Sequence, residues 1–372
     1  MNHIDFAFRN LTRRPVRSIL TALGVGLAVR SFIALYGLST SVEENVQQSV
    51  DERGSHLTIS RRGSAELFGS TIPETIGPRL AAIPGVQAVT RELISLAATS
   101  GDNHVIAVGW PDNSFFWQNV PLQAGRLPSA GERKVMLIGN DIAAALHKRL
   151  DDEITLIGEQ FRIIGITRFS SIINRNAVFV PLADLQNITF RSGVVTFFYV
   201  KLADADDLAG VKRIREAMEA PGDISVSTSE TMLRNDRMLG LLKAVSSSMG
   251  WVALFMGILM VLNTLLMAVI ERTREIGILS AIGWSPPRIM SALVLEGLIL
   301  SLIGSVAGAI IGVAGSHLLS AIPAIGRYVA VRPTPGLIAT SALAAIALGI
   351  LGSLYPAWLA TRQSPAAALE RT

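Results

Sequence analysis

The chain has 372 residues, of which half are hydrophobic and only 17% are charged. Together with a mean hydropathy of +0.44, this composition is too apolar for an ordinary soluble enzyme. The formal net charge of +4 does not indicate a nucleic-acid-binding protein, because the basic residues cluster beside hydrophobic runs, as they do at the flanks of membrane spans.

Four apolar runs are long enough to cross a bilayer, whose hydrocarbon core of about 30 Å needs roughly 20 helical residues. They predict transmembrane helices at residues 19–40, 244–270, 291–319 and 337–361. The first contains Arg30 and the third contains Glu296. An arginine near the middle of a span costs roughly 2.5 to 3.5 kcal/mol on insertion scales, so we expect Arg30 to face a partner or water. A pair between Arg30 and Glu296 is an alternative that their different predicted depths disfavour.

Basic residues in the short flanks predict the orientation of the spans. They are Arg9, Arg13, Arg14, Arg17, Arg272, Arg274, Arg288, Arg362 and Arg371. We therefore expect segments 1–18, 271–290 and 362–372, and both termini, to be cytoplasmic, with the insertion 41–243 and the loop 320–336 outside. A cleaved signal peptide is disfavoured, because the first apolar run exceeds a usual signal core and no convincing cleavage site follows it.

The insertion at residues 41–243 has ordinary soluble composition, and we expect a mixed α/β extracytoplasmic domain between the first and second spans. The predicted strands are His56–Arg61, Val86–Glu92, His104–Gly109, Val135–Ile138, Glu153–Ile157, Phe161–Thr167, Ala177–Val180 and Val195–Leu202. The predicted helices are Glu74–Ala82, Asp141–Leu150 and Asp206–Ala220. Core packing is the expected role of Phe115, Phe116 and Trp117.

Two stalk helices are expected to connect this domain to the spans. The stretch Val42–Arg53 extends the first span. Ser227 followed by Glu230 is typical of a capping box, which would open a helix that continues through Lys243 into the second span.

No motif indicates catalysis or cofactor binding. The chain lacks a phosphate loop and a dinucleotide-binding glycine motif. Its five histidines have no metal-ligand spacing, it has no cysteine, and Ser70 and Ser114 lack the hydrolase elbow. We therefore expect a non-catalytic chain with no cofactor or metal of its own. A membrane-anchored enzyme is disfavoured for the same reason.

The segment from Glu271 to Arg288, between the second and third spans, stands out from this background. Its predicted apolar face consists of Ile276, Leu279, Ala281 and Ile282, and its predicted accessible charges are Arg272, Arg274 and Glu275. Gly283 permits a sharp reversal, and Ser285 with Pro286 caps the next helix. The segment is either a helix that docks into a groove of a soluble partner or an ordinary solvated connector.

Three parts of the chain carry motifs that occur together in one protein family. The block Glu271–Gly283 precedes Glu296 at the entrance of the third span. The tail carries Pro356, Ala357, Ala360, Pro365, Ala368 and Leu369. The insertion carries Pro84–Val86, Gly125–Arg126, Val135–Gly139, Phe161–Ile166 and Val178–Leu182. Together these motifs resemble the MacB/FtsX/LolC-type (type VII) ABC transporter permeases, with a MacB-like periplasmic core domain and an FtsX-like permease domain.

The resemblance implies a non-catalytic permease subunit of the bacterial inner membrane. It would couple ATP hydrolysis by a separate ABC ATPase, which binds the ATP and Mg²⁺, to mechanotransmission and to export or extraction of a lipid, lipoprotein, peptide or small amphiphile. The other implied partners are a second permease subunit, a periplasmic adaptor with an outer-membrane channel, and membrane lipids. An FtsX-like scaffold that regulates an extracellular hydrolase is the alternative.

The resemblance also implies which residues dock the ATPase, and the chain departs from the family in two places. The implied docking residues are Arg272, Arg274, Glu275, Ile276, Gly277, Leu279, Ala281 and Gly283. The candidate intramembrane polar residues are Glu296, which fits the resemblance, and Arg30. Arg30 lies in a span that is usually uncharged, and the usual glycine before the turn at Asp152 is missing. The spacing of Gly304, Gly308 and Gly312 independently predicts close helix packing in the third span.

Overall fold

The computed structural model describes residues 15–62, 71–99, 104–228, 237–320 and 335–362. They divide into two compact units. The helical unit holds the described residues 15–41, 243–320 and 335–362, and the α/β unit holds those between 42 and 242. This division separates the predicted spans from the predicted α/β insertion.

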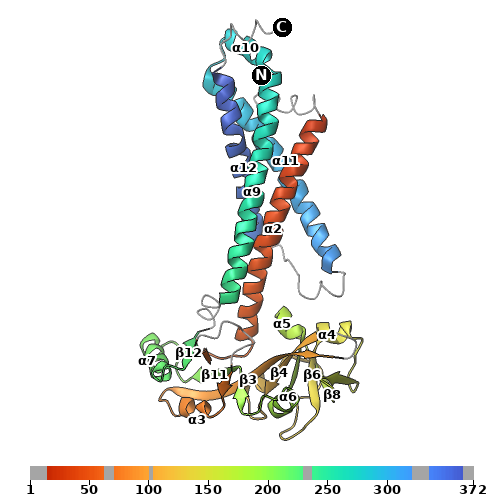
Figure 1. Cartoon of the computed structure of the whole chain (residues 1–372), viewed down its shortest axis with the longest axis vertical. Coiled ribbons are helices and arrows are strands. Elements are labelled where there is room, and N and C mark those ends of the chain that lie inside the picture. The colour runs from red at the N-terminus through yellow and green to blue at the C-terminus, as the bar shows by residue number, and fades with distance from the viewer. Residues whose placement is uncertain (1–14, 63–70, 100–103, 229–236, 321–334, 363–372) are drawn as a thin grey trace. The chain divides into compact units, whose positions relative to one another are not determined.

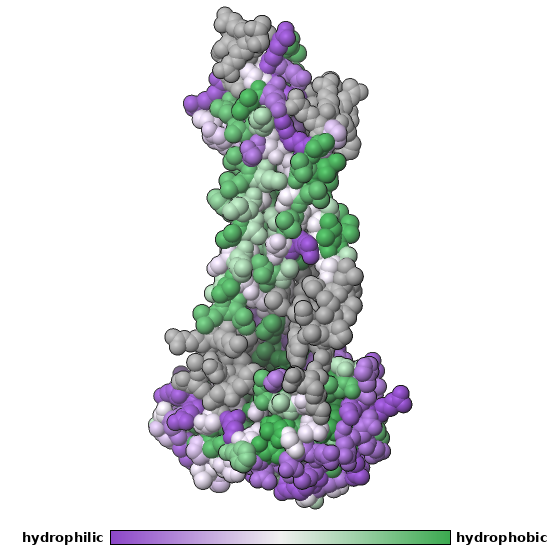
Figure 2. Space-filling view, turned by 45° about the vertical axis from the view of Figure 1, so that its right-hand side comes forward, coloured by the Kyte–Doolittle hydropathy of each residue, from purple (hydrophilic) through white to green (hydrophobic). Residues whose placement is uncertain are grey.

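The helical unit is built from five helices in the described part of the chain: α2 (Pro15–Asp51), α9 (Arg237–Glu271), α10 (Thr273–Ala281), α11 (Pro286–Ser320) and α12 (Pro335–Thr361). All but α10 are long and apolar enough to cross a membrane, and each of those contains one predicted span. On the face seen in Figure 2 this unit is predominantly apolar, with hydrophilic residues gathered at the end that carries α10 in Figure 1. The predicted fold class, with four transmembrane helices, is confirmed.

Glycines let the long helices approach each other closely. A β-carbon on Gly308 of α11 would lie 2.2 Å from the carbonyl oxygen of Gly26 in α2, and one on Gly304 would lie 2.6 Å from that of Ala22. Between α11 and α12, a β-carbon on Gly349 would lie 2.8 Å from the Cα atom of Leu298. The close packing predicted for Gly304 and Gly308 is therefore confirmed, because no side chain fits at either place.

The α/β unit contains twelve described strands and six described short helical segments. The strands are β1 (Leu57–Arg61), β2 (Ile72–Pro73), β3 (Val86–Ala98), β4 (His104–Trp110), β5 (Leu122–Gly125), β6 (Val135–Gly139), β7 (Glu153–Leu156), β8 (Glu159–Thr167), β9 (Ala177–Pro181), β10 (Val194–Val195), β11 (Phe197–Leu202) and β12 (Ile224–Ser227). The helical segments are α3 (Ile76–Ala81), the 3₁₀ turn η1 (Phe115–Asn119), α4 (Asn140–Ala145), α5 (Ile172–Arg175), α6 (Leu182–Ile188) and α7 (Leu208–Glu219).

Ten of these strands form one mixed sheet (Figure 1). Its order is β12-β1-β11-β3-β4-β9-β6-β8-β5, with β7 beside β8, while β10 pairs separately with β2. The long strand β3 joins the two halves, since it pairs with β11 along Val86–Glu92 and with β4 along Leu93–Ala98. Parallel pairs occur between β4 and β9 and between β6 and β8.

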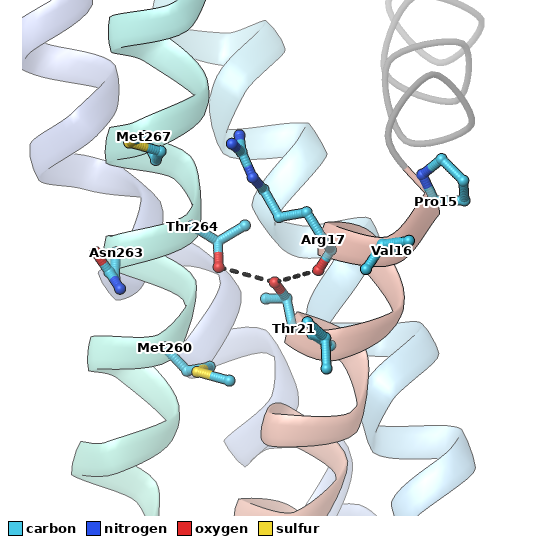
Figure 3. A pocket seen from close by; sticks show the side chains of 9 residues that line it. Pro15, Val16, Arg17, Thr21, Met260, Asn263, Thr264 and Met267 are labelled. Carbon is cyan, nitrogen blue, oxygen red and sulfur yellow. Dashed lines mark hydrogen bonds between the residues drawn. The ribbon is translucent and has the colours of Figure 1, made fainter.

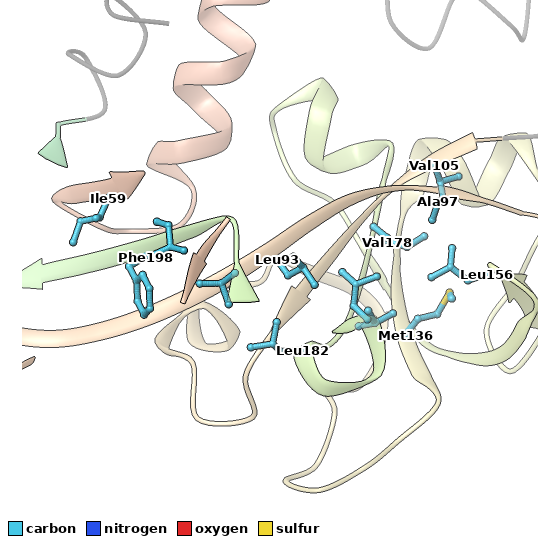
Figure 4. Close-up of a cluster of buried hydrophobic side chains, with 14 of the residues drawn as sticks. Ile59, Leu93, Ala97, Val105, Met136, Leu156, Val178, Leu182 and Phe198 are labelled. Carbon is cyan, nitrogen blue, oxygen red and sulfur yellow. The ribbon is translucent and has the colours of Figure 1, made fainter. Parts of the chain in front are cut away.

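The sheet buries a separate apolar cluster on each face, because successive strand residues point to opposite sides. Figure 4 shows the first cluster, in which Leu93 and Val178 of the strands pack with Leu182 of α6. The second cluster is aromatic, and in it Phe116 contacts Trp110 and Tyr199 at ring-centroid distances of 5.1 Å. Phe116 is 2% exposed, so the expectation that it packs in the core is confirmed.

Some elements of this unit were predicted wrongly, and others were not predicted. Ser227 is the last residue of β12 and pairs with Thr58 of β1, so it does not open a stalk helix. Glu230 lies outside the described residues. The short strands β2, β5 and β12, of two to four residues, were not predicted. The first stalk helix is confirmed, since α2 runs unbroken to Asp51.

Asp151 occupies the place at which the resemblance predicts a glycine, and its φ of +67° lies in the left-handed region that favours glycine. This left-handed conformation disfavours residues with a β-carbon, although aspartate tolerates it better than most. We expect Asp151→Gly to raise the free energy of unfolding by about 0.5 to 1 kcal/mol, measured as a higher thermal midpoint of the full chain. In the matched variant Asp152→Gly the midpoint should fall, since the Asp152 carboxylate accepts a hydrogen bond from the Arg149 amide at 2.7 Å. Shifts of the same sign in both variants would contradict this explanation.

Candidate functional site

One edge of helix α10 is packed against the helical bundle. Ile276 is 6% exposed and Gly277 is also buried. Ile276 lies in an apolar cluster with Val269, Ile289, Leu293, Ala357 and Ala360. Ala357 and Ala360 belong to the C-terminal motif, so the structure brings that motif and the α10 motif together in one cluster.

Arg272 ties the start of α10 to α11. Its Nε atom lies 2.9 Å from Oε2 of Glu275, and its Nη1 atom lies 3.6 Å from Oε2 of Glu296. The side chains of Arg272 and Glu296 are only 16% and 8% exposed. The sequence prediction that Arg272 is accessible was therefore wrong, because pairing with two carboxylates compensates its burial. Arg272, Ile276 and Gly277 position α10 instead of forming its outer surface.

The opposite edge of α10 is exposed and apolar. Ile278 and Ile282 are 45% and 69% exposed, and Ala281 is exposed between them. Residues at this spacing of three and four share one side of a helix. The predicted single apolar face was wrong, because Ile282 lies about 120° around the helix from Ile276. The helix has two apolar edges, of which only the inner one, with Ile276 and the half-buried Leu279, is covered.

Charged residues border the exposed edge of α10. Arg274 is exposed, and the side chain of Glu275 is 51% exposed although it contacts Arg272. Gly283 ends the helix with a φ of +97°, which favours glycine. Beyond it the exposed Arg288 stacks over the ring of Trp284, 4.5 Å from the centroid. An apolar strip with a charged rim is typical of a protein-binding surface.

The two intramembrane polar residues do not meet. Glu296 contacts Arg272. Arg30 lies against the other half of α11, where its Cγ atom is 3.4 Å from the position of a β-carbon on Gly312. The alternative of an Arg30–Glu296 pair was therefore wrong.

A surface groove of about 640 Å³ lies between α2 and α9 near Arg17 (Figure 3). The hydroxyls of Thr21 and Thr264 are 2.8 Å apart, and Thr21 also donates to the carbonyl of Arg17 at 2.8 Å. Met260 and Met267 line the groove. The sequence did not single it out, since its residue types are common in membrane helices.

Comparisons with known proteins decide the family. Residues 18–217 match the family model of the MacB-like periplasmic core domain, and residues 247–365 match that of the FtsX-like permease C-terminal. The chain belongs to the MacB/FtsX family of ABC transporter permeases. It is therefore a membrane protein, and the α/β unit is its extracytoplasmic domain.

Individual relatives of this permease are distant in sequence. It is 24% identical over 399 residues to an uncharacterized ABC transporter permease, YknZ of Bacillus subtilis, across 99% of this chain and 98% of that protein. It is 24% identical over 405 residues to the macrolide export ATP-binding/permease protein MacB of Bdellovibrio bacteriovorus, across 99% of this chain and 61% of that protein. The permease thus spans about three-fifths of that MacB protein. The crystal structure of the periplasmic region of MacB from Actinobacillus actinomycetemcomitans matches 51% of this chain and 96% of its own, with 17% identity and a TM-score of 0.40.

A buried polar network holds the end of α2 in the α/β unit of the permease. Arg53 donates from Nε to Oε2 of Glu92 at 2.9 Å, and the two side chains are 5% and 0% exposed. Glu92 also accepts from Nε1 of Trp110 at 2.7 Å and from the hydroxyl of Tyr199 at 3.0 Å. Burial lowers the pKa of Arg53, but the neighbouring Glu92 carboxylate more than offsets this and raises it above the usual value. Burial raises the pKa of Tyr199, so its hydroxyl stays a donor.

The neighbouring Glu52 makes a second connection at the same place. Its carboxylate accepts hydrogen bonds from the amide of Ser171 at 2.9 Å and from Nδ2 of Asn174 at 2.7 Å. Ser49, one turn earlier, donates to Oδ1 of Asn174 at 3.1 Å. The first stalk helix is therefore fixed to β3 through Glu92, which also binds Trp110 of β4 and Tyr199 of β11, and to α5 through Ser171 and Asn174. Sequence reasoning missed these residues because their partners lie 39 to 125 positions away.

Proposed function

We propose that this permease couples ATP hydrolysis by a separate ATPase to mechanical movement of its stalk helices. The exposed edge of α10, formed by Ile278, Ala281 and Ile282, supports this proposal. Exposing apolar side chains to water is unfavourable, and burying them in the groove of a soluble partner lowers the free energy. The inner edge of α10 and Arg272 would transmit the load to α11 and α12.

In this proposal α10 and both termini lie in the cytoplasm and the chain resides in the bacterial inner membrane. The basic residues Arg272, Arg274 and Arg288 on the α10 side support that orientation. Two permease subunits, identical or different, would each rest on one ATPase, which binds the ATP and Mg²⁺. A periplasmic adaptor and an outer-membrane channel complete the assembly where the cell has an outer membrane.

The proposed substrate is a lipid, lipoprotein, peptide or small amphiphile that is exported or extracted on the extracytoplasmic side. The MacB relative is named for macrolide export, which supports a small amphiphile. Because the stalk carries the movement, no wide channel between the spans is needed.

The double variant Ile278→Asp/Ile282→Asp tests the docking surface. We expect about a 100-fold or greater loss of ATPase association, because two isoleucines at about 1.5 to 3 kcal/mol each leave the interface. Both side chains are exposed in this chain, so the permease itself should fold normally. The measurement is the ATPase activity that co-purifies with the full-length permease from its native membrane.

The matched control is Phe190→Asp, which makes the same change at a side chain that is 94% exposed in the α/β unit. This control should retain the associated ATPase. An ATPase that stays bound to the double variant at the wild-type level would contradict the docking proposal. Absence of any ATPase from the wild-type eluate would contradict the whole coupling proposal.

A further inference from the structure

The proposed docking of the ATPase does not involve Arg30. This residue lies in the first span, and its side chain packs against α11. Helix α2 presents Ala22, Gly26 and Arg30 in one row, with a spacing of four residues. This row packs on Gly304, Gly308 and Gly312 of α11 in the same order. Since the two sets of numbers rise together, α2 and α11 run in the same direction.

The side chain of Arg30 runs toward the extracytoplasmic side of the membrane. Its Cγ atom lies beside Gly312, whereas its Nη2 atom is 3.1 Å from the position of a β-carbon on Gly315. Gly315 is three residues nearer the end of α11, and in α2 the same direction leads to the extracytoplasmic domain. Gly312 and Gly315, which carry no side chains themselves, therefore form a glycine seat in which the guanidinium lies against α11.

No carboxylate in the described residues of the helical unit is placed to neutralise Arg30. The acidic residues described there are Glu271, Glu275 and Glu296. Glu296 precedes Gly312 by sixteen residues, about 24 Å along α11. It also contacts Arg272. An uncompensated guanidinium is costly in hydrocarbon, so a counter-ion from outside the described helical unit would stabilise it.

The phosphate of an outer-leaflet lipid has the right chemistry and location for this counter-ion. Lipid phosphates are abundant at the interface toward which Arg30 extends, about 15 Å beyond it along α2 if the span ends at residue 40 as predicted. Arginine side chains reach toward that interface, and local thinning of the bilayer shortens the remaining distance. A guanidinium matches two phosphate oxygens with paired, charge-assisted hydrogen bonds.

We propose that Arg30 and the glycine seat bind the phosphate of an anionic lipid from the outer leaflet. The site lies between α2 and α11, next to the close crossing at Gly26 and Gly308. It is independent of the ATPase-docking proposal, because it requires only the helical packing and the extracytoplasmic position of the α/β unit. A lipid held there contacts the helix that continues into the stalk.

The test compares lipid retention by native mass spectrometry of the full-length permease released from nanodiscs that contain phosphatidylglycerol or phosphatidylcholine. We expect wild-type permease to retain phosphatidylglycerol and Arg30→Gln to retain about tenfold less. Gly315→Leu should reduce retention similarly, because it fills the seat while the charge remains. The control Arg213→Gln removes the same charge from the exposed face of α7 and should retain the lipid.

A second measurement separates a lipid from a free anion. In detergent, phosphatidylglycerol should raise the thermal midpoint of the wild type and leave that of Arg30→Gln unchanged. Equal retention of phosphatidylglycerol by wild type and Arg30→Gln would overturn the proposal. Inorganic phosphate that stabilises the lipid-free wild type as much as the lipid does would overturn the assignment to a lipid.

Discussion

Replacing Gly308 with leucine should disrupt the helical unit. Its β-carbon would lie 2.2 Å from the carbonyl oxygen of Gly26 and 2.8 Å from the Cα atom of the same residue. Both are backbone atoms, so no side-chain rotation relieves the overlap and α2 has to move away from α11. We expect a loss of about 3 kcal/mol, at the upper end of the range for overpacking. The readout is thermal unfolding of the full chain in detergent, followed by tryptophan fluorescence, to which Trp251, Trp284 and Trp358 of the helical unit contribute.

Two other glycines provide matched controls for this variant. Gly240→Leu makes the same change in α9 at a position with no heavy atom within 4 Å of the added β-carbon. It should be neutral or slightly stabilising, since glycine is a poor helix former. Gly312→Ala should be tolerated, because its β-carbon meets only Cγ of Arg30 at 3.4 Å. A Gly308→Leu permease that melts like Gly240→Leu would refute the close crossing of α2 and α11.

Glu92→Ala should have a comparable effect in the α/β unit. It removes the counter-charge of Arg53 and the acceptor of both Trp110 and Tyr199, all of which are at least 95% buried. Removing one partner of a buried ion pair typically costs 3 to 5 kcal/mol, because the other charge stays buried and uncompensated. We expect about that loss, together with easier cleavage of the α/β unit when the full chain is exposed to a short pulse of protease in urea.

An exposed ion pair of the same unit provides the control. Glu132 lies 2.6 Å from Arg126, and this hydrogen bond lowers the pKa of Glu132 to about 2. Glu132→Ala should nevertheless change stability little, since water already screens exposed charges. Similar losses in Glu92→Ala and Glu132→Ala would mean that burial is not the source of the effect at Glu92.

Hydropathy was sufficient to locate the four long helices, because a bilayer imposes a length and a composition that few other structures share. Strands with four or more β-branched or aromatic residues, such as Phe161–Thr167, were also found. Strand β5 was not predicted, since Leu122–Gly125 has four exposed residues and therefore no alternation of buried and exposed positions. The predicted capping box at Ser227 was wrong, because Ser227 pairs with Thr58, which is 169 residues away.

The sequence predicted the helix α10 but not which of its edges is exposed. The block around Ile276 identified α10, yet hydrophobicity alone does not tell which of two apolar edges faces the bundle. Ile276 turns inward because Ala357 and Ala360, from the far end of the chain, leave room for it. Arg272 is also held away from the surface, by its contact with Glu296. Such choices depend on contacts between distant segments.

The strand order of the extracytoplasmic sheet also governs how this domain reaches its folded state. The edge strand β12 and the early strand β1 pair through Thr58 and Ser227, while β1 pairs with β11 through Thr58 and Tyr199. Contacts between residues so far apart in sequence form slowly, because a long loop has to close before they gain any free energy. During synthesis, β1 therefore crosses the membrane and stays unpaired until β11 has followed, about 140 residues later. An unpaired strand edge invites aggregation, so this interval is when the domain would gain most from a chaperone on the extracytoplasmic side.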